Sequence, residues 1–123
     1  SVHISVPDTL TAAEIHPLGK HIDIDIYNEF GIVLTTGIYA ENTNDSKALE
    51  IKSELDKILS LYPHVVQVHA FYVQEEEKTI YYDIIFDFDE PDPVGTLRSI
   101  KADLAERVPD YQQCAILDTN FSN

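Results

Sequence analysis

The sequence contains no methionine and a single cysteine, Cys114. One thiol cannot form an internal disulfide or a thiolate zinc cluster, which fits a reducing compartment. No apolar run approaches the ~20 residues that cross a bilayer, and the first residues do not resemble a signal peptide. Since the initiator methionine is missing, we expect this chain to be a processed or excised piece of a longer protein.

Basic residues are also scarce. Only 8 stand against 22 acidic residues, and the formal net charge is -14. Such a field repels nucleic-acid phosphates and anionic lipid headgroups. We therefore expect no nucleic-acid partner and no direct binding to anionic membranes, whereas cations concentrate near the surface.

The motifs of catalysis are missing as well. The sequence has no glycine-rich phosphate loop, no G-x-S-x-G, no H-E-x-x-H, and no recognisable pairing of Cys114 with a histidine and an orienting acid. Carboxylates are plentiful, but general acid–base catalysis needs an acid positioned against a base. We expect that the protein is not an enzyme.

What the sequence does contain is enough apolar material for a core. Hydrophobic residues make up 44% of the 123 positions, and a chain of this length buries roughly two thirds of its unfolded surface. The clearest pattern is a strict alternation over residues 80–88. Apolar side chains share one side of it and three aspartates share the other: Ile80, Tyr82, Ile84, Phe86 and Phe88, against Asp83, Asp87 and Asp89.

A second β-rich segment precedes that strand. Residues 65–73 are rich in strand-forming side chains, and the charged run 74–78 between the two segments suits a hairpin loop. The pair predicts an antiparallel hairpin with one solvated face. On residues 111–118, Cys114 alternates in phase with Ile116, which predicts a buried, inert thiol.

The N-terminal part predicts a strand, a helix and another strand. Residues 1–6 alternate and residues 32–40 are β-rich, while Thr11 and Glu14 have the T-x-x-E spacing of a capping box. Apolar residues then recur at helical intervals to about residue 28.

Residues 17–28 leave two interpretations open. Inside a helix Pro17 costs ~3 kcal/mol and Gly19 ~1 kcal/mol relative to alanine, and residues 22–26 also alternate like a strand. A helix that starts at Pro17 avoids most of this cost, because proline is tolerated in the first turn.

Two further helices follow. Residues 48–62 have apolar side chains at helical spacing, and Pro63 ends the run. Asp92 followed by Pro93 is a typical helix start, and residues 111–118 form the last strand.

The resulting order is β-α-β-α-β-β-α-β, in which residues 80–118 repeat the pattern of residues 2–40. We expect an α+β fold, a ferredoxin-like sandwich whose antiparallel sheet carries helices on one face. The expected domains are residues 1–43, an incomplete first unit, and residues 44–123, a second unit, packed together as one compact body.

Two stretches resemble a known family. SVHISVPDTLTAAEIH, followed by a helix and GIVLTTGIYA, is similar to the cytoplasmic C-terminal domain of cation diffusion facilitator transporters, which export zinc, iron and manganese. VVQVHAFYVQEEEKTIYYDIIFDFD through DYQQCAILDTNFSN is similar to a second copy of that domain, found in a bacterial subset. The resemblance implies a soluble module on the cytoplasmic side of the cell membrane, attached to the transmembrane part of the same transporter and paired as a homodimer.

The resemblance also implies metal ligands. In some members of the family this domain binds Zn²⁺ between subunits, and the matching positions here are His3 and His16 in the first unit and His69 and Asp118 in the second. A divalent metal, Zn²⁺ before others, is thus the expected cofactor, since imidazole and carboxylate suit that ion. We expect His69 and Asp118 to lie on neighbouring strands.

Neither unit carries the complete family set. Thr36 and Ile38 stand where the last-strand pair of the first unit should be, and Ile85, Arg98 and Ile116 replace three histidines of the second. Any metal site must therefore be rebuilt from these partial sets, be completed by the missing N-terminal part, or be lost.

The sequence thus predicts a regulatory and dimerisation domain of a divalent-cation efflux transporter, in which metal binding favours one arrangement of the dimer. Two alternatives stay open. One is a metal-free structural oligomerisation module, and the other is a regulatory domain that binds a small organic molecule.

Overall fold

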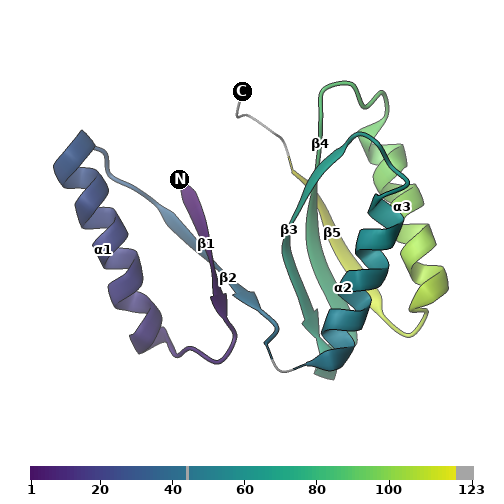
Figure 1. Cartoon of the computed structure of the whole chain (residues 1–123), viewed down its shortest axis with the longest axis horizontal. Coiled ribbons are helices and arrows are strands. Elements are labelled where there is room, and N and C mark those ends of the chain that lie inside the picture. Colours follow the sequence, from purple (N-terminus) through teal and green to yellow (C-terminus); the bar gives the residue numbers. More distant parts are fainter. Residues whose placement is uncertain (44, 119–123) are drawn as a thin grey trace. The chain divides into compact units, whose positions relative to one another are not determined.

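The computed structural model describes residues 1–43 and 45–118. The chain divides into two compact units, Ser1–Thr43 and Asn44–Asn123, which are described one at a time below. Figure 1 labels their helices and strands.

The first unit is a β-α-β arrangement of β1 (Val2–Pro7), α1 (Ala12–Phe30) and β2 (Thr36–Glu41). Strands β1 and β2 pair in parallel. Thr11 and Glu14 form the expected capping box at the start of α1, and Gly31 ends the helix with φ 68°. The strand interpretation of residues 22–26 is therefore wrong. The helix accommodates Pro17 in its second turn, because strong caps at both ends offset part of the cost.

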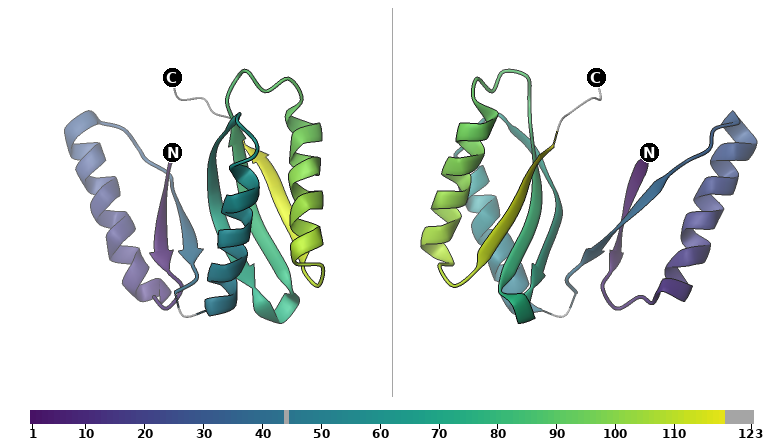
Figure 2. Two further views of the ribbon diagram at one scale, coloured as in Figure 1. Left: turned by 45° about the vertical axis from the view of Figure 1, so that its right-hand side comes forward. Right: turned by 180° about the vertical axis from the view of Figure 1, so that it is seen from behind.

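The second unit contains two helices, a hairpin and a third strand: α2 (Ser46–Leu59), β3 (Val65–Gln74), the 3₁₀ turn Glu75–Glu77, β4 (Thr79–Phe86), α3 (Pro93–Arg107) and β5 (Gln112–Asp118). The sheet order is β3-β4-β5. As expected, β3 and β4 are antiparallel, and Asp92 caps α3 by accepting a hydrogen bond from the Gly95 amide. Helices α2 and α3 both lie on one face of this sheet (Figure 2).

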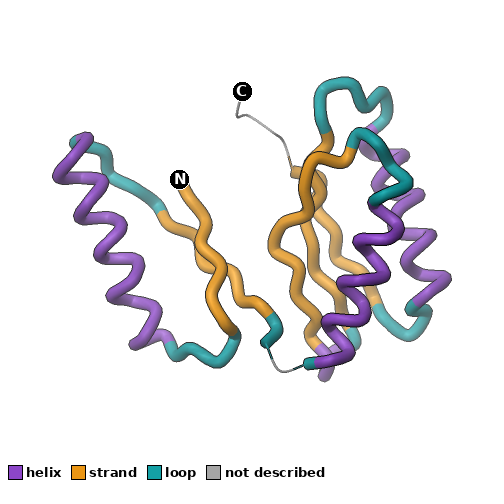
Figure 3. Tube along the Cα trace, viewed as in Figure 1, coloured by secondary structure: helices purple, strands orange, loops and turns teal. Residues whose placement is uncertain are grey.

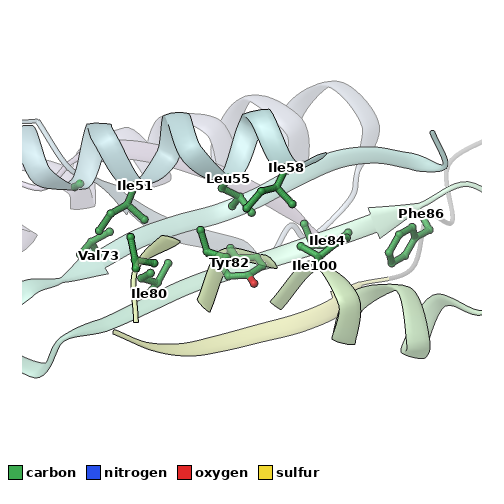
Figure 4. Close-up of a cluster of buried hydrophobic side chains, with 12 residues drawn as sticks. Ile51, Leu55, Ile58, Val73, Ile80, Tyr82, Ile84, Phe86 and Ile100 are labelled. Carbon is green, nitrogen blue, oxygen red and sulfur yellow. The ribbon is translucent and has the colours of Figure 1, made fainter. Parts of the chain in front are cut away.

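The core of the second unit lies between that face and the two helices. Alternate residues of β4 point into it, and the apolar stripes of α2 and α3 meet them (Figure 4). The largest side chains exposed by less than 2% are Tyr82, Ile51, Leu55, Ile58, Ile80, Ile84, Ile100 and Leu104. Phe88, which the alternation placed in the same row, is 83% exposed because β4 ends at Phe86.

Polar contacts tie the same elements together. Arg107 of α3 forms an ion pair with Glu54 of α2. At the hairpin, Tyr111 donates a hydrogen bond to Glu75 (2.6 Å), and the Lys78 ammonium lies 5.2 Å from the centre of the Tyr111 ring. The acidic hairpin tip is therefore fastened to the segment before β5.

The fold class is α+β, as expected, but the expected all-antiparallel sheet is wrong. Strands β1 and β2 pair in parallel, and so do β4 and β5. In both places a helix connects two strands that lie directly side by side, and such a crossover returns the chain in the same direction. Figure 3 shows this connection in each unit.

Strand β3 contains two irregularities where it carries one residue more than β4. The register shifts between Val65 and Gln67 and again between His69 and Tyr72. At the second shift Ala70 has φ 55°, in the left-handed region that costs an L-residue roughly 1–2 kcal/mol.

Replacing Ala70 by glycine should therefore stabilise the protein. Glycine removes the left-handed penalty, while its greater freedom in the unfolded chain returns part of the gain, for a net increase of about 0.5–1 kcal/mol in the free energy of unfolding. Urea unfolding followed by circular dichroism measures it. Ala102→Gly, at an exposed position inside α3, is the matched control and should lose about 1 kcal/mol. Equal losses at both positions would contradict the assignment of strain to Ala70.

Tyr62 should make stability depend on alkaline pH. Its hydroxyl donates a 2.6 Å hydrogen bond to Asp103 of α3, and this bond, with partial burial, raises the pKa of Tyr62 to about 12. Because the folded state holds the phenol proton more tightly, the stabilisation is complete below pH ~10 and is lost as the pH rises toward 12. Tyr62→Phe should lower stability at pH 8 and flatten its loss above pH 10, as measured by urea midpoints from pH 8 to 11.5. A variant with the same alkaline slope as the parent would exclude this role.

Candidate functional site

The second sheet has one face that carries no helix of its unit. The buried side chains of β4 point toward α2 and α3, so the alternate residues Tyr81, Asp83 and Ile85 point to the other side. We call this side the open face. Side chains on the open face can take part in binding without changing the packing of the core.

The strand registers set the neighbours on the open face. Asp83 of β4 lies opposite His69 of β3 on one side and Ile116 of β5 on the other. Two more sets of cross-strand neighbours lie on the same face, one on each side of this set. One contains Gln67, Ile85 and Asp118, and the other contains Tyr72, Tyr81 and Cys114. The open face thus brings together one histidine, two aspartates and a group of apolar and aromatic side chains.

Exposure on the open face is uneven. Ile116 is 61% exposed and Tyr81 39%, whereas Ile85 is buried. Partial burial, and after it the Glu77 carboxylate, raises the pKa of Tyr81. Cys114 is exposed, so the expectation of a buried thiol is wrong. It does share a phase with Ile116, but that phase points away from the core.

His69 is the most unusual member of this face. Its Nε2 atom is buried and has no hydrogen-bond partner among the described residues. A buried polar atom without a partner costs about 1–3 kcal/mol. The register shift at Ala70 follows His69 directly, and Asp83 lies opposite it on β4. Among the described residues, Nε2 of His69 is the one buried side-chain nitrogen or oxygen that is left without a hydrogen bond.

His69 and Asp118 do not lie on neighbouring strands, contrary to expectation. Strand β4 separates β3 from β5. Asp83 is the residue that the structure brings opposite His69. Asp83 is not among the site residues expected from the sequence. Alternation alone placed Asp83 on the polar side of its strand, but only the register, with its two shifts, identifies its neighbour.

His3 and His16 are not brought together either. Thr36 donates a hydrogen bond to Asp23 of α1, so the next residue of β2, Gly37, faces away from the helix. The His3 ring covers Gly37, where a Cβ would lie only 2.5 Å from it, and stands 4.9 Å from the Tyr39 ring. His3 therefore occupies the sheet face opposite α1, whereas His16 is an exposed residue of α1 itself.

The fit to a metal is partial. Over residues 1–43 and 45–118 no group of three or more His, Cys, Asp or Glu side chains is close enough to hold a metal ion. The unpartnered nitrogen of His69 does suit a divalent cation that prefers imidazole and carboxylate ligands. Among the described residues, one copy of the chain therefore holds no complete ligand set.

Comparison with known proteins adds no identification. No family model, no curated protein and no solved structure matches this chain. Among the described helices, none combines the length and the apolar character that a membrane span requires.

Replacing His69 by phenylalanine should stabilise the metal-free protein by about 1 kcal/mol, because it removes a buried nitrogen that has no partner. The contrasting variant is His64→Phe. His64 Nδ1 lies 3.1 Å from the Asp87 carboxylate, so this substitution removes a made contact and should not stabilise. Urea unfolding in the presence of a chelator measures both. Destabilisation by His69→Phe would show that the nitrogen is satisfied in solution.

Proposed function

We propose that this chain is a cytosolic regulatory and dimerisation domain of a divalent-cation efflux transporter, whose transmembrane part belongs to the same protein. The proposal starts from the resemblance of both halves of the sequence to the C-terminal domain of cation diffusion facilitators. The order of elements supports it, because β2, α2, β3, β4, α3 and β5 follow the β-α-β-β-α-β order of ferredoxin-like folds.

The proposed relationship to ferredoxin-like folds lies in the order of the elements and not in the way the strands pair. A ferredoxin-like fold splits each β-α-β unit by placing another strand between its two strands. Here β4 and β5 pair directly over seven residues each. We therefore propose a relative of that fold in which the splitting strand is not part of the second sheet.

The observation that carries the metal part of the proposal is the buried, unpartnered Nε2 of His69 on the open face. The net charge of -14 attracts cations to the whole surface. Asp83 and Asp118 add carboxylates to the same face. These features favour a divalent cation, with Zn²⁺ as the first choice, over an anionic or organic ligand.

Regulation follows if the metal is shared. Since one copy supplies only part of a ligand set, a second copy completes the coordination with its own His69 and Asp118. His3 and His16 remain candidate ligands of the first unit, each at a separate place. A metal that binds the paired state more tightly than the single chain shifts the equilibrium toward the pair. Cytosolic metal would then set the arrangement of the transporter dimer.

A metal-free oligomerisation module is the second candidate. Ile85 and Ile116 occupy the open face on either side of Asp83, at positions where the resembling family has histidine. Of the two, Ile116 is exposed, and an exposed apolar side chain there favours contact with another protein surface over coordination.

Calorimetric titration of Zn²⁺ into the chelator-treated chain, with mass followed by light scattering, tests the proposal. We expect one Zn²⁺ per two chains, a rise in the dimer fraction, and at least about tenfold weaker binding in His69→Ala, since the loss of a ligand costs at least 1.4 kcal/mol.

The matched control is His21→Ala, which removes an exposed histidine of α1 and should bind Zn²⁺ as the parent does. Equal dimer fractions with and without Zn²⁺, together with no heat of binding, would favour the metal-free module instead.

A further inference from the structure

The first unit lacks a core of its own. Val6 is its one buried hydrophobic residue among positions 1–43, and α1 has no buried residue. Large apolar side chains remain exposed on the helix, on the segment after it and on β2: Leu18, Phe30, Ile32, Val33 and Ile38. A two-stranded pair alone is at best marginally stable in water, and α1 adds no buried side chain to it. Something else must cover this surface.

The uncovered surface is concentrated where β2 should begin. The sequence favours a strand from residue 32, but β2 starts at Thr36, where the ladder with β1 begins. Residues 32–35 have strand-forming side chains without a strand opposite, and Val33 is 85% exposed. Residues 32–35 could thus extend β2 at its start, but β1 does not reach far enough to pair with them.

Charge decides which partner fits. Residues 1–7 and 30–40 contain no Asp, Glu, Lys or Arg, whereas the carboxylates of the first unit lie on α1, in the loops and at Glu41, the last residue of β2. Natural sheet edges are usually protected by charged side chains, and this edge is not. A cationic partner would find no carboxylate along it. A second copy, by contrast, presents the same uncharged edge. Elsewhere the two copies repel each other, because each carries a net charge of -14.

We infer that β2 and the preceding residues 32–35 pair antiparallel with the same segment of a second copy, which gives a four-stranded sheet across a two-fold axis. A two-fold axis between identical strands requires the antiparallel direction. The pairing supplies a strand to residues 32–35 and covers Ile32 and Val33. This inference rests on the proposed dimerisation, but it does not require metal.

Sedimentation velocity of the chelator-treated full chain, over a range of concentrations, is the experiment. The parent should dimerise without metal, and Val33→Lys should raise the dimer dissociation constant at least about tenfold, because it places a charge on the paired strand. Leu61→Lys is the matched control. Leu61 is 72% exposed in the second unit, so this variant should dimerise as the parent does. Circular dichroism confirms that both variants are folded.

Hydrogen exchange gives an independent readout. The amides of residues 32–35 should become protected as the concentration of the parent rises, and should stay unprotected in Val33→Lys.

A chain that stays monomeric without metal, or a dimer that Val33→Lys leaves unchanged, overturns the inference. If Zn²⁺ still drives dimerisation in either case, the proposed function stands while this interface falls. If the metal-free dimer forms as described and Zn²⁺ has no effect, the interface stands and the regulatory proposal falls.

Discussion

The strict alternation of β4 is the constraint on which the second unit depends. Every second residue of this strand is apolar and enters the space beneath α2 and α3, where Tyr82, Ile80 and Ile84 are fully buried. The same period of two leaves Tyr81, Asp83 and Ile85 on the other side. A single strand therefore fixes both the core and the open face, and its neighbours β3 and β5 only decide which side chains stand next to one another. Changing the register by one residue would exchange the two sets.

The two units bury their apolar side chains to different degrees. In the second unit two helices and three strands enclose a contiguous core. In the first unit a long, well-capped helix accompanies only two strands, and its apolar residues stay largely exposed. Local signals such as the Thr11 capping box and Gly31 are enough to specify the elements. They do not supply the apolar contacts that would stabilise these elements as a body.

Much of the local structure could be predicted from the sequence, because its signals are local. Asp92 before Pro93, the alternation of residues 80–86 and the stop at Pro63 each report on a few neighbouring residues. Strand pairing could not be predicted in the same way. Whether β5 lies beside β4 or one strand further away depends on contacts between distant segments, and this decides whether Asp118 neighbours His69. The bulge at Ala70 has no sequence signal, since alanine is an uncommon choice for a left-handed position. The candidate site was therefore only half predicted: His69 and Asp118 were singled out, but Asp83 between them was not.

The two register shifts of β3 have a consequence for how the protein avoids aggregation. Strand β3 is an edge of its sheet, and its length of ten residues would make it a template for unwanted strand addition. Two extra residues bend and twist that edge, so a straight foreign strand cannot follow it. Strand β2 has no such irregularity and no charged residue before Glu41. The chain thus distorts the free edge of β3, whereas the free edge of β2 stays regular and carries no charge up to Ala40.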